Sequence, residues 1–199
     1  MNIVGLSGSI SAPSRTRSLV ESIVQAIGRR TLKQGDVIDV AEIAVELGQA
    51  LSFADYPVAL NEAIDELTSA DIIVVGVPIY KASYPGLFKH FFDLIDPKAL
   101  EGKVAVIAAT GGSNQHALVL EHQLRTLLSF MGVYSAPKTV FALDSDFTNY
   151  RLVNPDIVKR IDALAEQALW LARKHCLDLG AERQAVHFSV AEERVSSVA

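Results

Sequence analysis

The feature that most constrains the fold of this chain is the apolar run Ile72–Val77, which is rich in branched residues and ends at Pro78. The run shows no polar alternation, which indicates a strand that is buried on both faces. Such strands are typical of the centre of a parallel sheet that helices cover on either side. We therefore predict an α/β protein built around this strand.

Similar apolar runs alternate with segments of helical periodicity along most of the chain. This alternation implies right-handed βαβ units and a doubly wound, five-stranded parallel sheet of the flavodoxin-like order 2-1-3-4-5. The other strands are expected near residues 2–6, 37–40, 104–109 and 139–143. Helices are expected near residues 17–30, 45–51, 60–69, 87–95, 115–131 and 155–177.

Length and composition fit one domain over residues 1–178, because the 199-residue chain is half hydrophobic and has no internal repeat. Residues 179–199 lose the apolar rhythm and are expected to form a C-terminal tail, either disordered or docked on a neighbouring subunit. The net charge of −5 and the scattered basic residues argue against a nucleic-acid partner. Because Cys176 is the only cysteine and no run is long enough to span a membrane, we expect a cytoplasmic protein.

The first strand leads into a loop of small hydroxylated residues, Ser7–Ser14, and then into a helix. Free backbone N–H groups and the helix dipole make such a helix start favourable for an anion, and Arg15 and Arg17 add positive charge. The loop matches neither the dinucleotide-binding nor the P-loop glycine pattern. The sequence predicts a phosphate-bearing ligand here.

Three loops are expected to meet at the carboxyl edge of the sheet, where open parallel sheets bind their ligands. They are Ser9–Arg17, Pro78–Tyr84 and Thr110–Gln115. The first suits a phosphate, the second supplies two tyrosines and a lysine, and the third is small enough for a flat ring to approach the backbone. A phosphate pocket beside a planar-ring pocket fits flavin mononucleotide (FMN). No cluster of residues has metal-ligand spacing.

These loops carry a resemblance to a known family. The chain resembles the NAD(P)H-dependent FMN reductases of the flavodoxin-like fold, most closely those that supply reduced FMN to sulfonate monooxygenases. The matching segments are Gly8-Ser9, Ser14–Ser18, Pro78–Tyr84 with Gly86 and Lys89, and Ala109–Gly112.

The resemblance implies which residues hold FMN. Phosphate binding is implied for Ser9, Ser14, Arg15, Thr16 and Arg17. Ring contacts are implied for Pro78, Ile79, Tyr80, Lys81, Ala82 and Ser83, with Thr110, Gly111 and Gly112 forming the floor. The candidate catalytic residues are Lys81, which can favour negative charge on the reduced flavin, and His116.

The resemblance also implies a reaction, in which hydride passes from NADPH or NADH to flavin N5 and reduced FMN leaves for a partner monooxygenase. Two alternatives are an FMN-containing quinone or azo reductase and a flavodoxin-type electron carrier without NAD(P)H activity. A π-bulge is expected around Gln115–Ala117, near the flavin and the subunit interface. Asp144, Asp146 and Tyr150, after the fifth strand, are candidates to close over the site or over a subunit contact.

The helix expected over residues 115–131 is apolar around much of its circumference, which exceeds what one core-facing stripe requires. We therefore expect a homodimer or homotetramer that buries the surplus.

Overall fold

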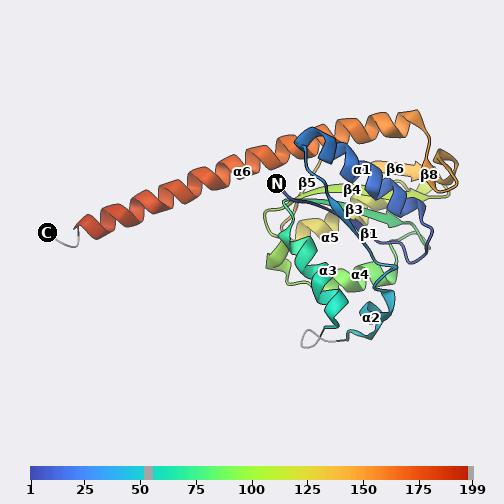
Figure 1. Ribbon diagram of the computed structural model, residues 1–199, viewed down its shortest axis with the longest axis horizontal. Helices are drawn as coiled ribbons and strands as arrows, with labels where there is room; N and C mark the ends of the chain where they lie inside the picture. Colours follow the sequence, from blue (N-terminus) through green and yellow to red (C-terminus); the bar gives the residue numbers. More distant parts are fainter. Residues whose placement is uncertain (52–55, 197–199) are drawn as a thin grey trace.

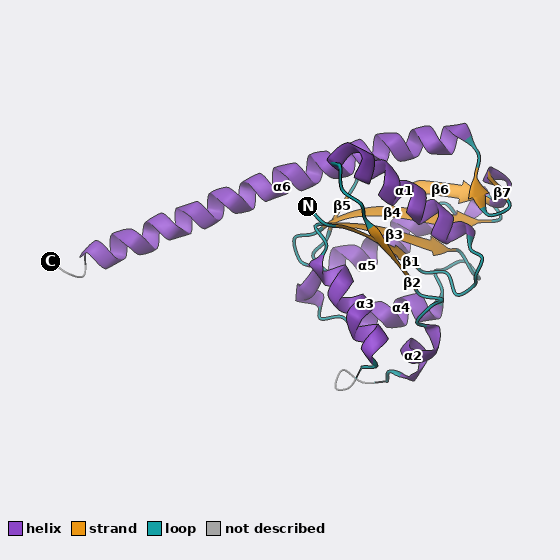
Figure 2. Ribbon diagram, viewed as in Figure 1, coloured by secondary structure: helices purple, strands orange, loops and turns teal. Residues whose placement is uncertain are grey.

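The computed structural model of the protein describes residues 1–51 and 56–196, and the side chains among them as far as His175. A parallel sheet forms the middle layer (Figure 2). Its order is β2-β1-β3-β4, with β5 and β6 both on the outer edge of β4, so the predicted order is confirmed. The strands are β1 (Ile3–Ser7), β2 (Asp36–Asp39), β3 (Ile72–Pro78), β4 (Val104–Gly111), β5 (Tyr134–Ser135) and β6 (Val140–Leu143).

The fifth strand of the sheet is interrupted. Tyr134 pairs with Val104 at the start of β4, and Val140 pairs with Ala108 near its end. The break between the two pieces contains Pro137, which has no N–H group to donate to a ladder. The sequence predicted only the second piece, because the first is two residues long.

Helices cover both faces of the sheet (Figure 1). On one face lie α1 (Arg15–Thr31) and α6 (Pro155–Ser196), which share a core with Ile72 and Val74 of β3. The other face packs on Ile73, Val75 and Val77 of the same strand. Its helices are α2 (Ala44–Gln49), α3 (Val58–Ser69), α4 (Gly86–Asp93) and α5 (Arg125–Phe130).

The short elements lie in the connections. Two 3-10 turns, η1 (Pro97–Leu100) and η2 (Asn114–His116), flank β4. After β6 come the 3-10 turn η4 (Asp144–Asp146) and a small antiparallel hairpin that the sequence did not predict, β7 (Phe147–Thr148) with β8 (Arg151–Leu152).

The prediction of one continuous helix over residues 115–131 is wrong in detail. The segment consists of η2, a π-helical turn η3 (Leu120–Leu124) and α5. Hydrophobic periodicity over so short a span does not separate i→i+4 from i→i+5 hydrogen bonding, which explains the difference.

The expected end of the last helix near Leu177 is also wrong. Helix α6 continues to Ser196 and projects away from the domain (Figure 1). Residues 177–196 contain no proline that would interrupt the helix. Within the described residues, no helix combines the length and apolar character that crossing a membrane requires.

Close contact between α1 and the sheet depends on glycines in the strands. A Cβ atom on Gly76 of β3 would stand 2.3 Å from Val20 Cγ2 in α1. We expect Gly76→Ala to lower the free energy of unfolding by about 2 kcal/mol, because the added methyl overpacks this interface. Urea denaturation measures the loss.

The matched control is Gly48→Ala in α2, where the new methyl would meet nothing within 4 Å. Alanine is the better helix former, so this variant should be as stable as the parent or more stable. An unchanged unfolding midpoint for Gly76→Ala would contradict the packing described here.

Candidate functional site

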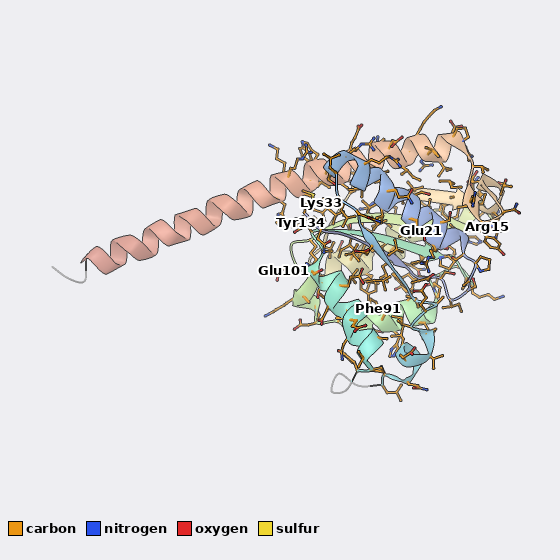
Figure 3. The ribbon with its side chains drawn as sticks, viewed as in Figure 1. Arg15, Glu21, Lys33, Phe91, Glu101 and Tyr134 are labelled. Atoms are coloured by element: carbon orange, nitrogen blue, oxygen red, sulfur yellow. The ribbon has the colours of Figure 1, made fainter. Side chains whose placement is uncertain are left out.

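A pocket of about 430 Å³ opens where the carboxyl ends of β1, β3 and β4 meet. Arg15 marks this edge of the sheet in Figure 3, whereas Lys33, Glu101 and Tyr134 lie toward the opposite edge. The lining residues come from the three predicted loops and from the segment after β6. They are Ser9, Ser11–Thr16, Pro78–Tyr80, Thr110–Gly112, Asp144 and Tyr150.

The first loop and the start of α1 form a donor-rich end of the pocket. Ser14 caps the helix, because its Oγ accepts a hydrogen bond of 3.2 Å from the backbone N–H of Arg17. The first turn of α1 contains no acidic residue, so no side chain neutralises the positive end of its dipole. Ser9 is almost fully buried and its Oγ lies 3.3 Å from the backbone N of Ser11. This end suits a phosphate group.

Arg15 stands at the mouth of this donor-rich end. Its Nη1 lies 3.4 Å from Oδ1 of Asp144, and its guanidinium carbon lies 5.3 Å from the centre of the Tyr150 ring. All three residues line the pocket. The segment after β6 therefore closes one side of the site, as the sequence suggested for Asp144 and Tyr150.

Asp146 differs from these two residues, because it does not line the pocket. Its carboxylate is buried and accepts hydrogen bonds from the backbone N–H of Leu143, at 2.7 Å, and from Nδ2 of Asn154, at 2.6 Å. These bonds fix the turn that leads from β6 into the β7–β8 hairpin. Asp146 is thus a structural residue of the segment that carries Asp144 and Tyr150.

Arg17 also lies outside the pocket lining. Its guanidinium contacts the carboxylates of Glu21, at 3.0 Å, Asp39, at 3.1 Å, and Glu42. Hydrogen bonds that Arg17 donates to Glu42, Glu21 and Asp39 raise its pKa, although burial opposes the rise. Burial raises the pKa of the Asp39 carboxyl, because desolvation outweighs its hydrogen bonds to Ala41 N–H and Arg17. Arg17 therefore ties α1 to the end of β2 and is not directed at the pocket.

The floor of the pocket is built where α1 crosses β4. The hydroxyl oxygens of Thr16 and Thr110 lie 2.7 Å apart and are both buried. The backbone N–H of Ile79 donates to the Thr110 carbonyl at 2.9 Å, which joins the second and third loops. A Cβ on Gly112 would meet nothing within 4 Å, so the backbone there is open to a flat ligand.

The second loop folds into a tight turn beside the pocket. Tyr80 and Ser83 exchange backbone hydrogen bonds of 2.8 and 3.0 Å, and Lys81 and Ala82 form the tip. Tyr80 lines the pocket, but Lys81, Ala82 and Ser83 do not. Ring contacts from these three residues remain a prediction.

His116 ends η2 and is half-buried, and it does not line the pocket. The π-helical turn is present but begins at Leu120, C-terminal to the expected Gln115–Ala117. Ser11, Ala12 and Pro13 are lining residues that the sequence argument did not single out, although they belong to the loop it identified.

Among the described residues, no group of three or more His, Cys, Asp or Glu is placed to hold a metal ion.

A flavodoxin-like sheet with an anion-favouring helix start beside an open backbone floor is suited to a flavin nucleotide. Comparison with known proteins agrees. A family model described as NADPH-dependent FMN reductase matches residues 1–148. The chain belongs to this family, and is thus a flavin oxidoreductase that uses FMN and NADPH or NADH.

Similar proteins span most of the chain. It is 43% identical to an FMN reductase (NADPH) of Pseudomonas aeruginosa, over 83% of this chain and 89% of that protein. It is 41% identical to the NADH-dependent FMN reductase SfnE of Pseudomonas putida, over 88% of this chain and 94% of that protein. The apo crystal structure of the NADH:FMN oxidoreductase EmoB is 36% identical, with a TM-score of 0.73, over 84% of this chain and 87% of that one.

The two arginines in the first turn of α1, Arg15 and Arg17, should have separate effects on flavin binding and on stability. Arg15→Ala should weaken FMN binding about tenfold and leave riboflavin, which has no phosphate, nearly unaffected, because a charge-assisted phosphate contact is lost. Arg17→Ala should weaken neither flavin selectively. It should lower the free energy of unfolding by about 2 kcal/mol, because the buried Asp39 loses its partner while Arg17 itself is partly exposed.

Flavin fluorescence titration and urea denaturation measure the two effects. Equal losses of FMN and riboflavin affinity in Arg15→Ala would contradict the assignment of the phosphate end. A selective loss of FMN affinity in Arg17→Ala would show that Arg17 leaves its carboxylates to bind the ligand.

Proposed function

We propose that this protein supplies reduced FMN to a partner monooxygenase of the sulfonate or organosulfur type, using NADPH or NADH as the hydride donor. The observation that carries the flavin part is the pocket, in which the open start of α1 and the backbone floor at Gly112 stand side by side. The partner rests on the sequence resemblance, above all on the Tyr80–Tyr84 segment. The names of the relatives, which include NADPH and NADH reductases, support both nucleotides as donors.

When bound, FMN supplies the redox chemistry, accepting at N5 the hydride that the nicotinamide C4 releases. The residues of this chain bind and orient the reactants. Ser9, Ser14 and Arg15 hold the phosphate, and the Thr110–Gly112 backbone supports the ring. Such a reaction needs no protein side chain of strongly shifted pKa at the reacting atoms, which agrees with the absence of an acid–base cluster in the described lining.

The phosphate end has features that favour a flavin that leaves after reduction. Arg15 and Asp144 are 41% and 57% exposed, so water reaches both groups. The Asp144 carboxylate also competes with phosphate for the same guanidinium, and its charge repels the dianion. Both effects reduce the affinity for FMN relative to a closed, purely basic pocket. We therefore propose that FMN is a dissociable substrate.

Steady-state kinetics tests this function. We expect purified protein to oxidise NADPH or NADH only when free flavin is added, with a rate that saturates in FMN. Riboflavin should act with a higher KM, because it lacks the phosphate. The assay crosses both nucleotides with both flavins and follows nucleotide absorbance.

The control reaction omits flavin. Protein that retains FMN through dialysis and turns over independently of added FMN would contradict the proposal and favour the quinone or azo reductase alternative. Protein that binds FMN and oxidises neither nucleotide would favour an electron carrier.

We also propose that the protein forms a homo-oligomer through the face made by α3, α4 and α5. Phe130 is 75% exposed and lines a groove of about 1220 Å³ on this face together with Tyr84 and Phe92, and Leu118, which precedes the π-helical turn, is 64% exposed. A second copy of the chain would bury this apolar surface. Light scattering should show a dimer or tetramer at micromolar concentration, and a monomer would contradict the proposal.

A further inference from the structure

The turn that follows Tyr80 has a backbone conformation that is unfavourable for its residues. Its two tip residues, Lys81 and Ala82, have φ angles of +51° and +65°. Two-residue hairpin turns with positive φ at both positions favour Asn-Gly or Gly-Gly, since a side chain with a Cβ atom disfavours the left-handed region. The surrounding structure must therefore hold this turn in place.

Gln123, in the π-helical turn η3, makes the contacts that hold it. Its Nε2 donates to the carbonyl oxygen of Ala82 at 3.2 Å, and the hydroxyl of Ser83 donates to its Oε1 at 2.5 Å. One side-chain amide thus uses its donor and its acceptor on two consecutive residues of the turn. The opposite amide orientation would place two acceptors together at the Ala82 carbonyl, so these contacts also fix which way the amide points.

The restraint passes from Ser83 to the pocket through the backbone. Ser83 N–H donates to the Tyr80 carbonyl at 3.0 Å, and Tyr80 N–H donates to the Ser83 carbonyl at 2.8 Å. Tyr80 itself lines the pocket next to Ile79. Whatever fixes Ser83 therefore fixes the position of Tyr80 at the site.

The π-helical turn that carries Gln123 is itself anchored to the sheet. Arg125 pairs with Glu121 through Nε, at 2.6 Å, and Nη2, at 3.1 Å. Its Nη1 also donates to the Ala136 carbonyl at 3.1 Å, in the break between β5 and β6. Hydrogen bonds from Arg125 lower the pKa of Glu121, which keeps this pair charged. These contacts hold the turn that carries Gln123 against the edge of the sheet.

We propose that Gln123 is a positioning residue for flavin binding, which holds the Tyr80–Ser83 turn in its left-handed conformation against the flavin ring. This inference rests on the proposed function, because it assigns the ring end of the same pocket to the turn. Two different elements then position the two ends of the flavin pocket. Helix α1 sets the phosphate end, and the π-helical turn sets the ring end.

The experiment measures dissociation constants for FMN and riboflavin by flavin fluorescence titration of the full-length protein. We expect Gln123→Ala to weaken both flavins by the same factor, about tenfold, because the ring is common to both and the phosphate is untouched. Gln123→Glu should bind both flavins no better than Gln123→Ala, since its carboxylate still accepts from the Ser83 hydroxyl but places a second acceptor at the Ala82 carbonyl. Ser83→Ala should add little in the Gln123→Ala background, because the shared bond is already gone.

His122→Ala is the matched control, because His122 and Gln123 both lie on the π-helical turn and both line the groove on the α3–α5 face, and the His122 side chain is exposed. This variant should bind both flavins as the parent does. An equal loss in His122→Ala, or a loss in Gln123→Ala confined to FMN, would overturn the inference, as would unchanged affinities in Gln123→Ala. Failure of the parent protein to bind either flavin would instead contradict the proposed function.

Discussion

The parallel pairing of β3 with β1 on one side and β4 on the other determines where the site can form. Because all three strands run in the same direction, the loops that follow them emerge at one edge of the sheet. The burial of β3 on both faces requires helices above and below, and α1 must therefore start directly beside the end of β1. The pocket thus follows from the way the core is built.

Charge is distributed unevenly around the start of α1. Arg17 faces three carboxylates and joins the helix to β2, whereas Arg15, two residues earlier, faces the pocket and a single exposed carboxylate. One arginine therefore contributes to the fold and the other remains available to an anion. The two acidic residues after β6 also differ in role. Asp146 accepts hydrogen bonds that stabilise the turn, whereas Asp144 lines the pocket.

The sequence was sufficient to predict the features that depend on local pattern. Buried strands, helix periodicity and the small, hydroxylated loops predicted the sheet order and most of the residues that line the pocket. The partners of Arg17 could not be predicted, because Asp39 and Glu42 reach it only through the register of β1 with β2. The left-handed turn at Lys81 and Ala82 was also missed, because its residues lack the glycine or asparagine that signals such a turn.

Two further differences have the same origin. The resemblance implied a π-bulge around Gln115–Ala117 but not its position at Leu120–Leu124, because apolar spacing does not record the extra residue in each i→i+5 hydrogen-bonded turn. Helix α6 continues past the apolar pattern that predicted it and projects away from the domain (Figure 1).

A crystal structure of the FMN complex tests the central claim most directly. Our account predicts that the FMN phosphate lies against the hydroxyls of Ser9 and Ser14 and the first backbone N–H groups of α1, with Arg15 turned from Asp144 toward it. The flavin ring should lie between Tyr80 and the Thr110–Gly112 backbone. A phosphate bound at any other place, or a ring outside this pocket, would contradict the account.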